Sequence, residues 1–335
     1  MIKKECFTAE WIEQVSSELH YNDKNLIEKV IRALSLLEML VKAGCPLVFK
    51  GGTALMLILG KSAHRLSIDI DLICPPGTNI EDYLKSFADF GFINLELVER
   101  KQRDDADIPK SHSKFFYQIA YRNDTDAQSY ILLDVLYEDI HYFRTQQIAI
   151  NCPFIRLEGK PLMVTVPSAE DILGDKLTAF APNTTGIPYY RNGRSCSMEI
   201  AKQLYDVGRL FENVSDLQIT KEAFRKIAVV ELSYRSFGTD IGQVFNDIRQ
   251  TALCISTRGK AGEGDFDLIQ DGIIRVKSFM YKQRYLIDHA IIDAARAAYL
   301  ATLIEKGINE IESYSNNPAD IKDMVCLLYT SDAAD

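Results

Sequence analysis

The sequence predicts an α/β (α+β) protein, in which a mixed sheet with flanking helices is followed by an all-helical region. Three patterns lead to this fold class. Apolar residues recur every three to four positions from residue 8 to residue 43, as in amphipathic helices. Short apolar or alternating segments, separated by glycine and proline, then continue to residue 166, as in strands. From Pro167 onward the helical pattern returns.

The length and composition support more than one domain. The chain has 335 residues, of which 47% are hydrophobic, so it can bury more than one apolar core. The change of pattern at Pro167 is the expected domain boundary. We therefore expect N-terminal helices over 1–43, an α/β domain over 44–166, a helical domain over 167–325 and a non-native tail over 326–335.

The expected tail is the end of the chain from Cys326 to Asp335. These ten residues resemble the in-frame translation of a sequencing adapter, and such segments are excluded from fold reasoning. We expect the native sequence to diverge near Val325. The alternative is a genuine small polar tail.

Charge and cysteine usage exclude several classes of protein. The net charge of −9 argues against a non-specific coat on nucleic acid, although local basic patches remain compatible with it. The seven cysteines form no CxxC pair, which indicates reduced thiols rather than a disulfide framework or a zinc site. No apolar block follows the first lysines, and no apolar run approaches the roughly 20 residues of a membrane helix. We expect a cytoplasmic protein without a membrane partner.

The first candidate site residues follow a short apolar strand. Leu47–Phe49 leads directly into Gly51 and Gly52, and Thr53 is the expected N-cap of a helix over Ala54–Leu59 that Gly60 closes. Glycines permit a close approach of the backbone, and a helix N-terminus attracts phosphate. Two glycines alone most often mark a simple turn.

A pair of carboxylates follows in an alternating segment, Leu66–Leu72, which predicts a strand with two unlike faces. Asp69 and Asp71 then share one face, with Cα atoms roughly 6.5–7 Å apart. Neighbouring carboxylates repel each other unless a cation lies between them, and hard oxygen ligands suit Mg²⁺. An isolated D-x-D pair is nevertheless most often a solvated strand face.

Asp134 is a third candidate, inside the run from Ile131 to Tyr137 that suits a strand buried on both faces. A carboxylate there needs a metal, a basic partner or an open site. Three carboxylates from two strands could hold two Mg²⁺ ions for phosphoryl transfer. The other segments expected before residue 167 are a helix over 80–90, a loop over 100–113, and strands over 92–99, 115–121, 130–137, 148–150 and 162–166.

The region after Pro167 is expected to be helical. Ser168 and Asp171 resemble a capping box that opens a helix through Phe180. Residues 181–195 are rich in Gly, Pro, Asn and Arg and predict a loop. The expected later helices are 198–211, 221–236, 243–256, 269–282 and 287–309.

Two motifs together resemble a known family. Phe49-Lys-Gly-Gly-Thr-Ala-Leu55 and Arg65-Leu-Ser-Ile-Asp-Ile-Asp-Leu72 are similar to the signature of AbiEii/AbiGii-type toxin nucleotidyltransferases, within the DNA polymerase beta-like nucleotidyltransferase superfamily. The resemblance covers roughly residues 30–215. It implies a polymerase beta-like catalytic domain over 44–166. By this resemblance, the triphosphate would be bound by Gly51, Gly52, Thr53, Arg65 and Ser67, and Mg²⁺ by Asp69, Asp71 and Asp134.

Two later residues extend the resemblance. Lys176 matches a helical lysine that reaches the nucleotide, although a lysine on an apolar helix face can simply extend to solvent. Asp206 matches the last acid of the family's K-D-x-x-D-L helix, and its alternative role is an ion pair with Lys202. Gln203 and Val207 depart from that pattern, so position 203 loses its expected role.

The resemblance implies an Mg²⁺-dependent transfer of NMP from an NTP to an acceptor hydroxyl. We expect the toxin of a toxin–antitoxin or phage-defence pair that acts on RNA, with tRNA as acceptor, and a separately encoded antitoxin. One alternative is modification of a small molecule such as an antibiotic, and another is a non-catalytic nucleotide-binding regulatory module. RNA would require a local basic groove, for which the candidates are Lys101, Arg103, Lys110, Lys114, Arg191 and Arg194.

Overall fold

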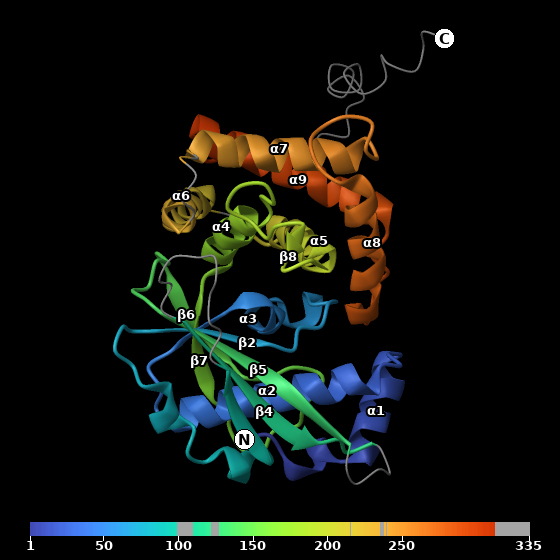
Figure 1. Cartoon of the computed structure of the whole chain (residues 1–335). Helices are drawn as coiled ribbons and strands as arrows, with labels where there is room; N and C mark the ends of the chain where they lie inside the picture. Colours follow the sequence, from blue (N-terminus) through green and yellow to red (C-terminus); the bar gives the residue numbers. More distant parts are fainter. Residues whose placement is uncertain (99–109, 122–126, 215, 235–237, 239, 312–335) are drawn as a thin grey trace.

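The computed structural model describes residues 1–98, 110–121, 127–214, 216–234, 238 and 240–311. The expected tail over 326–335, the expected divergence at Val325, and the groove candidates Lys101 and Arg103 lie outside these residues. The described part forms two layers, with the sheet and the N-terminal helices on one side and the later helices on the other (Figure 1). Helix α3, Gly51–Leu59, lies between the two layers.

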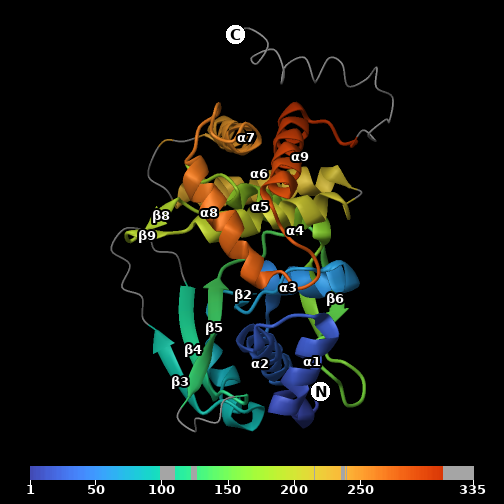
Figure 2. The same ribbon diagram turned by 90° about the vertical axis from the view of Figure 1, so that its right-hand side faces the viewer.

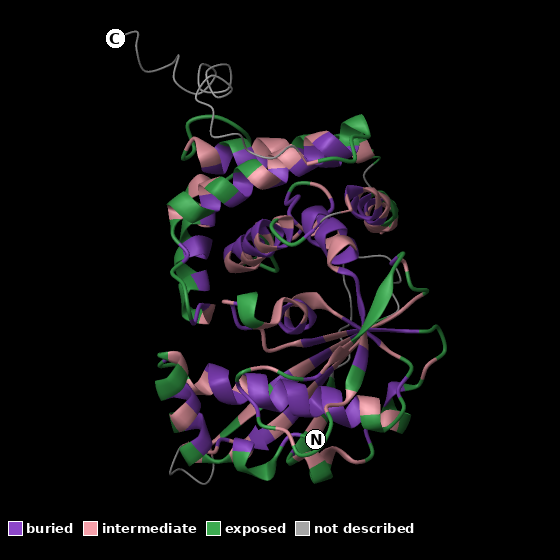
Figure 3. Cartoon of the chain, turned by 180° about the vertical axis from the view of Figure 1, so that it is seen from behind, coloured by how far each residue is buried: buried purple, intermediate pink, exposed green. Residues whose placement is uncertain are grey.

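The N-terminal helices pack on the sheet, as the apolar periodicity predicts. They are the 3-10 helix Lys4–Phe7 and the α-helices α1, Ala9–Leu19, and α2, Lys24–Lys42. Helix α2 contacts the two central strands and is buried along most of its length (Figure 3). Its position covers one face of the sheet and leaves the opposite face for the site.

The main sheet has five strands in the order β1-β2-β5-β4-β3 (Figure 2). β2 and β5 are parallel, and the other neighbours are antiparallel, so the predicted mixed sheet is confirmed. The strands are β1 Val48–Lys50, β2 Ile70–Cys74, β3 Asn94–Val98, β4 Lys110–Gln118 and β5 Gln128–Tyr137.

Three predicted boundaries in this region are wrong. β2 begins at Ile70 rather than at Leu66, because the backbone N–H of Leu66 instead donates to the carbonyl of Phe279 at 2.8 Å. β4 begins at Lys110, inside the segment expected to be a charged loop, since its polar residues alternate with buried ones. The expected helix over 80–90 is two 3-10 turns, Ile80–Tyr83 and Phe87–Phe90.

Two small antiparallel pairs complete the β-structure. β6, Thr145–Ala149, pairs with β7, Met163–Pro167, and β7 contacts β1. The expected loop over 181–195 contains the short hairpin β8, Tyr190–Arg191, and β9, Arg194–Ser195.

The region after β7 is helical, as predicted. Ser168 is the N-cap of α4, where its hydroxyl accepts a hydrogen bond from the backbone N–H of Asp171 at 3.1 Å. No helix among the described residues is both long enough and apolar enough to cross a membrane. The helices are α4 Ala169–Ala179, α5 Ser197–Phe211, α6 Leu217–Ser233, α7 Ile241–Ser256, α8 Phe266–Val276 with a 3-10 turn at Lys277–Phe279, and α9 Ile287–Lys306.

Each of the two layers contains a large cluster of buried apolar side chains. One contains α2 and the main sheet, with Leu34 and Phe49 fully buried. The other contains the later helices, with Leu204 and Leu300 fully buried. The domain limits expected at 43 and 166 stay a prediction.

Candidate active site

The first turn of α3 lies against β2 at a separation that only glycine permits. Gly51 has φ +78°, and a Cβ at this position would lie 2.1 Å from Oδ2 of Asp71. A Cβ at Gly52 would lie 2.7 Å from Oγ of Ser67 and 3.0 Å from a terminal nitrogen of Arg65. The two glycines therefore let Asp71, Ser67 and Arg65 gather over the N-terminus of the helix, where an anion is favoured.

The expected role of Thr53 as the helix N-cap is wrong. The helix begins at Gly51 and Lys50 is its N-cap residue, so Thr53 lies inside the first turn. Its side chain is fully buried, and its hydroxyl donates to the backbone carbonyl of Asp69 at 2.7 Å. Thr53 thus holds the segment before β2 in place, and this contact directs its hydroxyl to protein rather than to a ligand.

Asp71 and Asp134 lie side by side at the centre of the sheet. They are Cα partners in the parallel pair β2–β5, and Asp69 lies just before β2. Burial and the neighbouring charges of Asp69 and Asp134 raise the pKa of Asp71 to about 7. Burial also raises the pKa of Asp69, against the opposing effect of Lys202. The three carboxylates therefore act on one another electrostatically, as the sequence predicts.

The surroundings of Asp134 differ from the expectation of a strand buried on both faces. Burial alternates along β5, and the side chain of Asp134 is 39% exposed. Nδ1 of His112, on the adjacent strand β4, lies 2.5 Å from Oδ1 of Asp134. Asp134 is thus partly open to solvent and also has a ring nitrogen of His112 as a partner.

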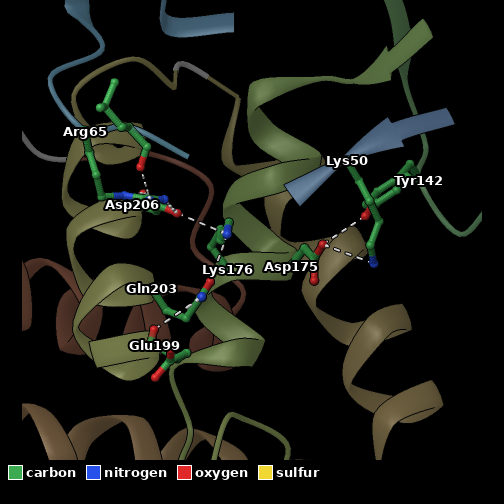
Figure 4. A network of polar contacts seen from close by, with 9 residues as sticks. Lys50, Arg65, Tyr142, Asp175, Lys176, Glu199, Gln203 and Asp206 are labelled. Carbon is green, nitrogen blue, oxygen red and sulfur yellow. Dashed lines mark hydrogen bonds and ion pairs between the residues drawn. The ribbon is translucent and has the colours of Figure 1, made fainter. Parts of the chain in front are cut away.

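A buried network of charges joins Arg65, Lys176 and Asp206 (Figure 4). Asp206 accepts hydrogen bonds from Nε of Arg65 at 3.0 Å and from one terminal nitrogen at 2.7 and 2.8 Å. Nζ of Lys176 lies 3.1 Å from the same carboxylate. Burial works against the charge of Asp206, but Arg65 and Lys176 lower its pKa below the ordinary value. The partners of Asp206 are therefore these two cations rather than Lys202.

The residue at position 203 has a role despite its departure from the family pattern. Oε1 of Gln203 accepts a hydrogen bond from Nζ of Lys176 at 2.9 Å (Figure 4). Lys176 is only 8% exposed, so it does not extend to solvent as the alternative expectation has it. The neighbouring Lys202 places Nζ 3.9 Å from the ring centroid of Phe279. Burial and the charge of Arg65 lower the pKa of Lys202 to about 8.

A cavity of about 310 Å³ opens beside Asp71 and Asp134. Lys50 lines this cavity, and its Nζ lies 4.0 Å from Oδ2 of Asp175 (Figure 4). The same oxygen accepts a hydrogen bond from the hydroxyl of Tyr142 at 2.9 Å. Although burial works against its charge, Asp175 and Asp71 raise the pKa of Lys50. The polar wall includes Lys50, Asp71, Lys110, His112, Asp134, Tyr142, Asp175 and Arg191.

Two groove candidates, Lys110 and Arg191, thus lie beside the carboxylates. Lys114 instead pairs with Glu96 at 3.5 Å, and Arg194 is exposed on the β8–β9 hairpin. Among the described residues, no three His, Cys, Asp or Glu side chains are arranged as a complete metal site. The donor chemistry still fits Mg²⁺, which is commonly held by one or two carboxylates together with substrate phosphates.

Three residues of the site escape prediction from sequence. His112 lies in a segment with a loop-like composition, and only its register opposite Asp134 reveals it. Lys50 and Lys202 lie inside the motifs, but nothing in their local sequence predicts that their ammonium groups lie near the carboxylates. The tertiary structure brings these groups to the site. The sequence does hold one signal for Lys50: it directly precedes the glycine pair, and a charged residue at such a position can be predicted to lie near a bound phosphate.

The arrangement of glycine-bordered helix, paired strand carboxylates and buried cations is the one that the sequence resemblance to nucleotidyltransferases leads us to expect. The structure is similar to MenT4, a nucleotidyltransferase toxin from Mycobacterium tuberculosis H37Rv, with a TM-score of 0.55 and 11% identity over 95% of this chain and 98% of that one. It is also similar to JHP933 from Helicobacter pylori, with a TM-score of 0.44 and 16% identity over 90% and 98% of the two chains. No curated protein matches the sequence.

The family model described as nucleotidyl transferase AbiEii toxin, type IV toxin–antitoxin system, matches residues 34–298. The chain therefore belongs to the AbiEii family and is a nucleotidyltransferase toxin. The match confirms the resemblance drawn from the two motifs and extends beyond residue 215, through most of the helical region.

Proposed function

We propose that this toxin transfers NMP from an NTP to a hydroxyl of RNA, with tRNA as the acceptor, in an Mg²⁺-dependent reaction. The observation that carries the proposal is the register of Asp71 beside Asp134, directly over the first turn of α3. This geometry brings two carboxylates and a helix N-terminus to one point. A separately encoded antitoxin is the expected protein partner, in keeping with the toxin–antitoxin description of the family.

The triphosphate would bind at the N-terminus of α3. The N–H groups in the first turn of any helix have no partner within the helix, and Ser67 and Arg65 lie against Gly52 of this turn. Lys176 adds a second cation to the same network through Asp206. Arg65 and Lys176 would stabilise the negative charge that develops on the phosphates during transfer.

The acceptor hydroxyl would approach from the side of Asp134. Its oxygen attacks the α-phosphorus, the bond between the α-phosphorus and the bridging oxygen breaks, and pyrophosphate leaves. Asp134 is partly exposed beside the cavity and can accept the hydroxyl proton. Lys110 and Arg191 line the same cavity and can contact phosphates of an RNA acceptor.

Asp69, Asp71 and Asp134 are the residues that would hold Mg²⁺. When bound, Mg²⁺ would offset the repulsion among these carboxylates and between them and the phosphates. Burial, together with the charges of Asp69 and Asp134, raises the pKa of Asp71 to about 7, and a cation bound between the carboxylates would favour its ionised form.

The test is transfer from α-labelled NTPs in the presence of Mg²⁺, with purified tRNA or with candidate hydroxylated small molecules as acceptor. We expect label on tRNA from the wild type and none from the double variant Asp69→Asn/Asp71→Asn. The matched control is Asp82→Asn/Asp89→Asn, which makes the same change at two exposed positions and should transfer normally.

The other outcomes discriminate the alternatives. Label on a small molecule alone would replace RNA with an antibiotic-like acceptor. Full toxicity of the Asp69→Asn/Asp71→Asn variant would show that catalysis is not the source of toxicity and would favour a regulatory module.

A further inference from the structure

His112 is a polar residue at the site to which neither the motifs nor the proposed reaction assigns a role. It lies on β4 directly opposite Asp134 of β5, as its Cα partner in the antiparallel pair. Strands β4 and β5 run side by side in Figure 2. Side chains of such partners project on the same face of a sheet, so the pairing of the two side chains follows from the register. The side chain of His112 is 12% exposed and lines the cavity beside Asp71.

The direction of the hydrogen bond follows from the chemistry of the two groups. An ionised carboxylate can only accept, so Nδ1 of His112 carries the proton and donates to Oδ1 of Asp134 at 2.5 Å. The other ring nitrogen, Nε2, is buried and has no hydrogen-bond partner within the described part of the chain. Among the described residues, Asp134 is therefore the hydrogen-bond partner of this imidazole.

We propose that His112 is a positioning residue that holds Oδ1 of Asp134 and leaves Oδ2 to bind the divalent cation. This inference rests on the proposed Mg²⁺-dependent transfer. With 39% of its side chain exposed, Asp134 is not held in one rotamer by packing alone. A hydrogen bond from this largely covered ring restricts the carboxylate, as outer-shell partners do for ligands in metal sites generally.

The test compares His112→Leu, which removes the donor, with His112→Asn, whose amide can donate from a similar position. The probe is Mn²⁺, titrated in the presence of a non-hydrolysable NTP analogue and followed by electron paramagnetic resonance. We expect His112→Leu to weaken Mn²⁺ binding roughly tenfold, in line with losses of outer-shell partners. His112→Asn should remain within about threefold of the wild type because the donor is kept.

Kinetics supply a second readout. In the transfer assay His112→Leu should lower kcat about 10-fold to 100-fold. The KM for the NTP should stay unchanged, because the Arg65 and Lys176 network does not include His112. His20→Asn, at an exposed helix end with φ +52°, is the matched control and should behave as wild type in both assays.

Several outcomes would overturn the inference. Wild-type Mn²⁺ affinity in a folded His112→Leu variant would do so, and so would an equal loss in the Leu and Asn variants. If His112→Leu does not fold, a tenfold loss in His112→Asn is the deciding contrary result. Failure of the proposed function is distinct, since the wild type itself would then neither bind Mn²⁺ with the analogue nor transfer label.

Discussion

Arg65 and Asp206, which are 141 residues apart in sequence, form a buried hydrogen-bonded ion pair that joins the segment before β2 to helix α5. Their side chains are 6% and 2% exposed. Lys176 of α4 shares the same carboxylate, so one acid pairs with two cations and the group keeps a net positive charge. Because the two cations are expected to contact the triphosphate, Asp206 holds them in position when no substrate is bound.

Replacing Asp206 with Asn should be strongly destabilising. The change leaves Arg65 and Lys176 buried without their carboxylate, and breaking a buried pair in this way costs about 3–5 kcal/mol of unfolding free energy. Urea unfolding measures the loss. Asp288→Asn, which breaks an exposed pair with Arg258, should cost less than about 1 kcal/mol. Similar losses in the two variants would contradict the importance of the buried pair.

Replacing Gly51 with Ala should abolish transfer. The added Cβ would lie 2.1 Å from Oδ2 of Asp71, so the carboxylate must move away from the first turn of α3. The matched control is Gly60→Ala at the other end of the same helix. Gly60 has φ +52° and nothing within 4 Å of an added Cβ, so this variant should lose about 1–3 kcal/mol of stability from backbone strain and keep its activity. An active Gly51→Ala enzyme would refute the close contact.

The pKa of Asp71 should depend on its acidic neighbours. In metal-free protein we expect a pKa of about 7, because burial and the charges of Asp69 and Asp134 disfavour ionisation. Asp69→Asn removes one of these charges and should lower the pKa of Asp71. Added Mg²⁺ should lower it as well, since a cation favours the ionised form. NMR titration of carbon-labelled aspartate measures these shifts, and an ordinary pKa in the metal-free wild type would be the contrary result.

Asp293 of α9 should make the stability depend on pH. Burial raises the pKa of Asp293 to about 6 from 3.8, despite the nearby guanidinium groups of Arg209 and Arg296. A raised pKa means that the folded state binds the proton more tightly than the unfolded state. The stabilisation that protonated Asp293 contributes to the folded state is therefore fully present below pH 3.8. It is lost as the pH rises through about 6.

Comparison with Asp293→Asn, which does not titrate, isolates this effect. The unfolding free energy of the wild type should fall relative to that of the variant by roughly 2 kcal/mol between pH 4 and pH 7, as the shift from 3.8 to about 6 implies over this range. Urea unfolding at the two pH values measures the difference. Parallel behaviour of the two proteins would show that Asp293 titrates normally.

Much of the fold can be predicted because its signals are local. The apolar periodicity of residues 8–43 and of the region after Pro167 predicts the helices, since apolar residues recur every three to four positions on the buried face. The errors arise where distant contacts override the local pattern. The backbone of Leu66 bonds to Phe279 instead of joining β2. The start of β4 resembles a loop because it is polar, and two of its residues, Lys110 and His112, line the cavity.

The candidate site divides in the same way. The glycine pair and the D-x-D spacing are local, so the sequence by itself identified Gly51, Gly52, Asp69 and Asp71 as candidate site residues. The antiparallel pairing of β1 with β2 then places Gly51 against Asp71. Only the tertiary structure decided that Asp206 binds Arg65 and that His112 faces Asp134. Strand order, register and helix packing are set by contacts between distant segments, and spacing along the chain does not encode which distant partners meet.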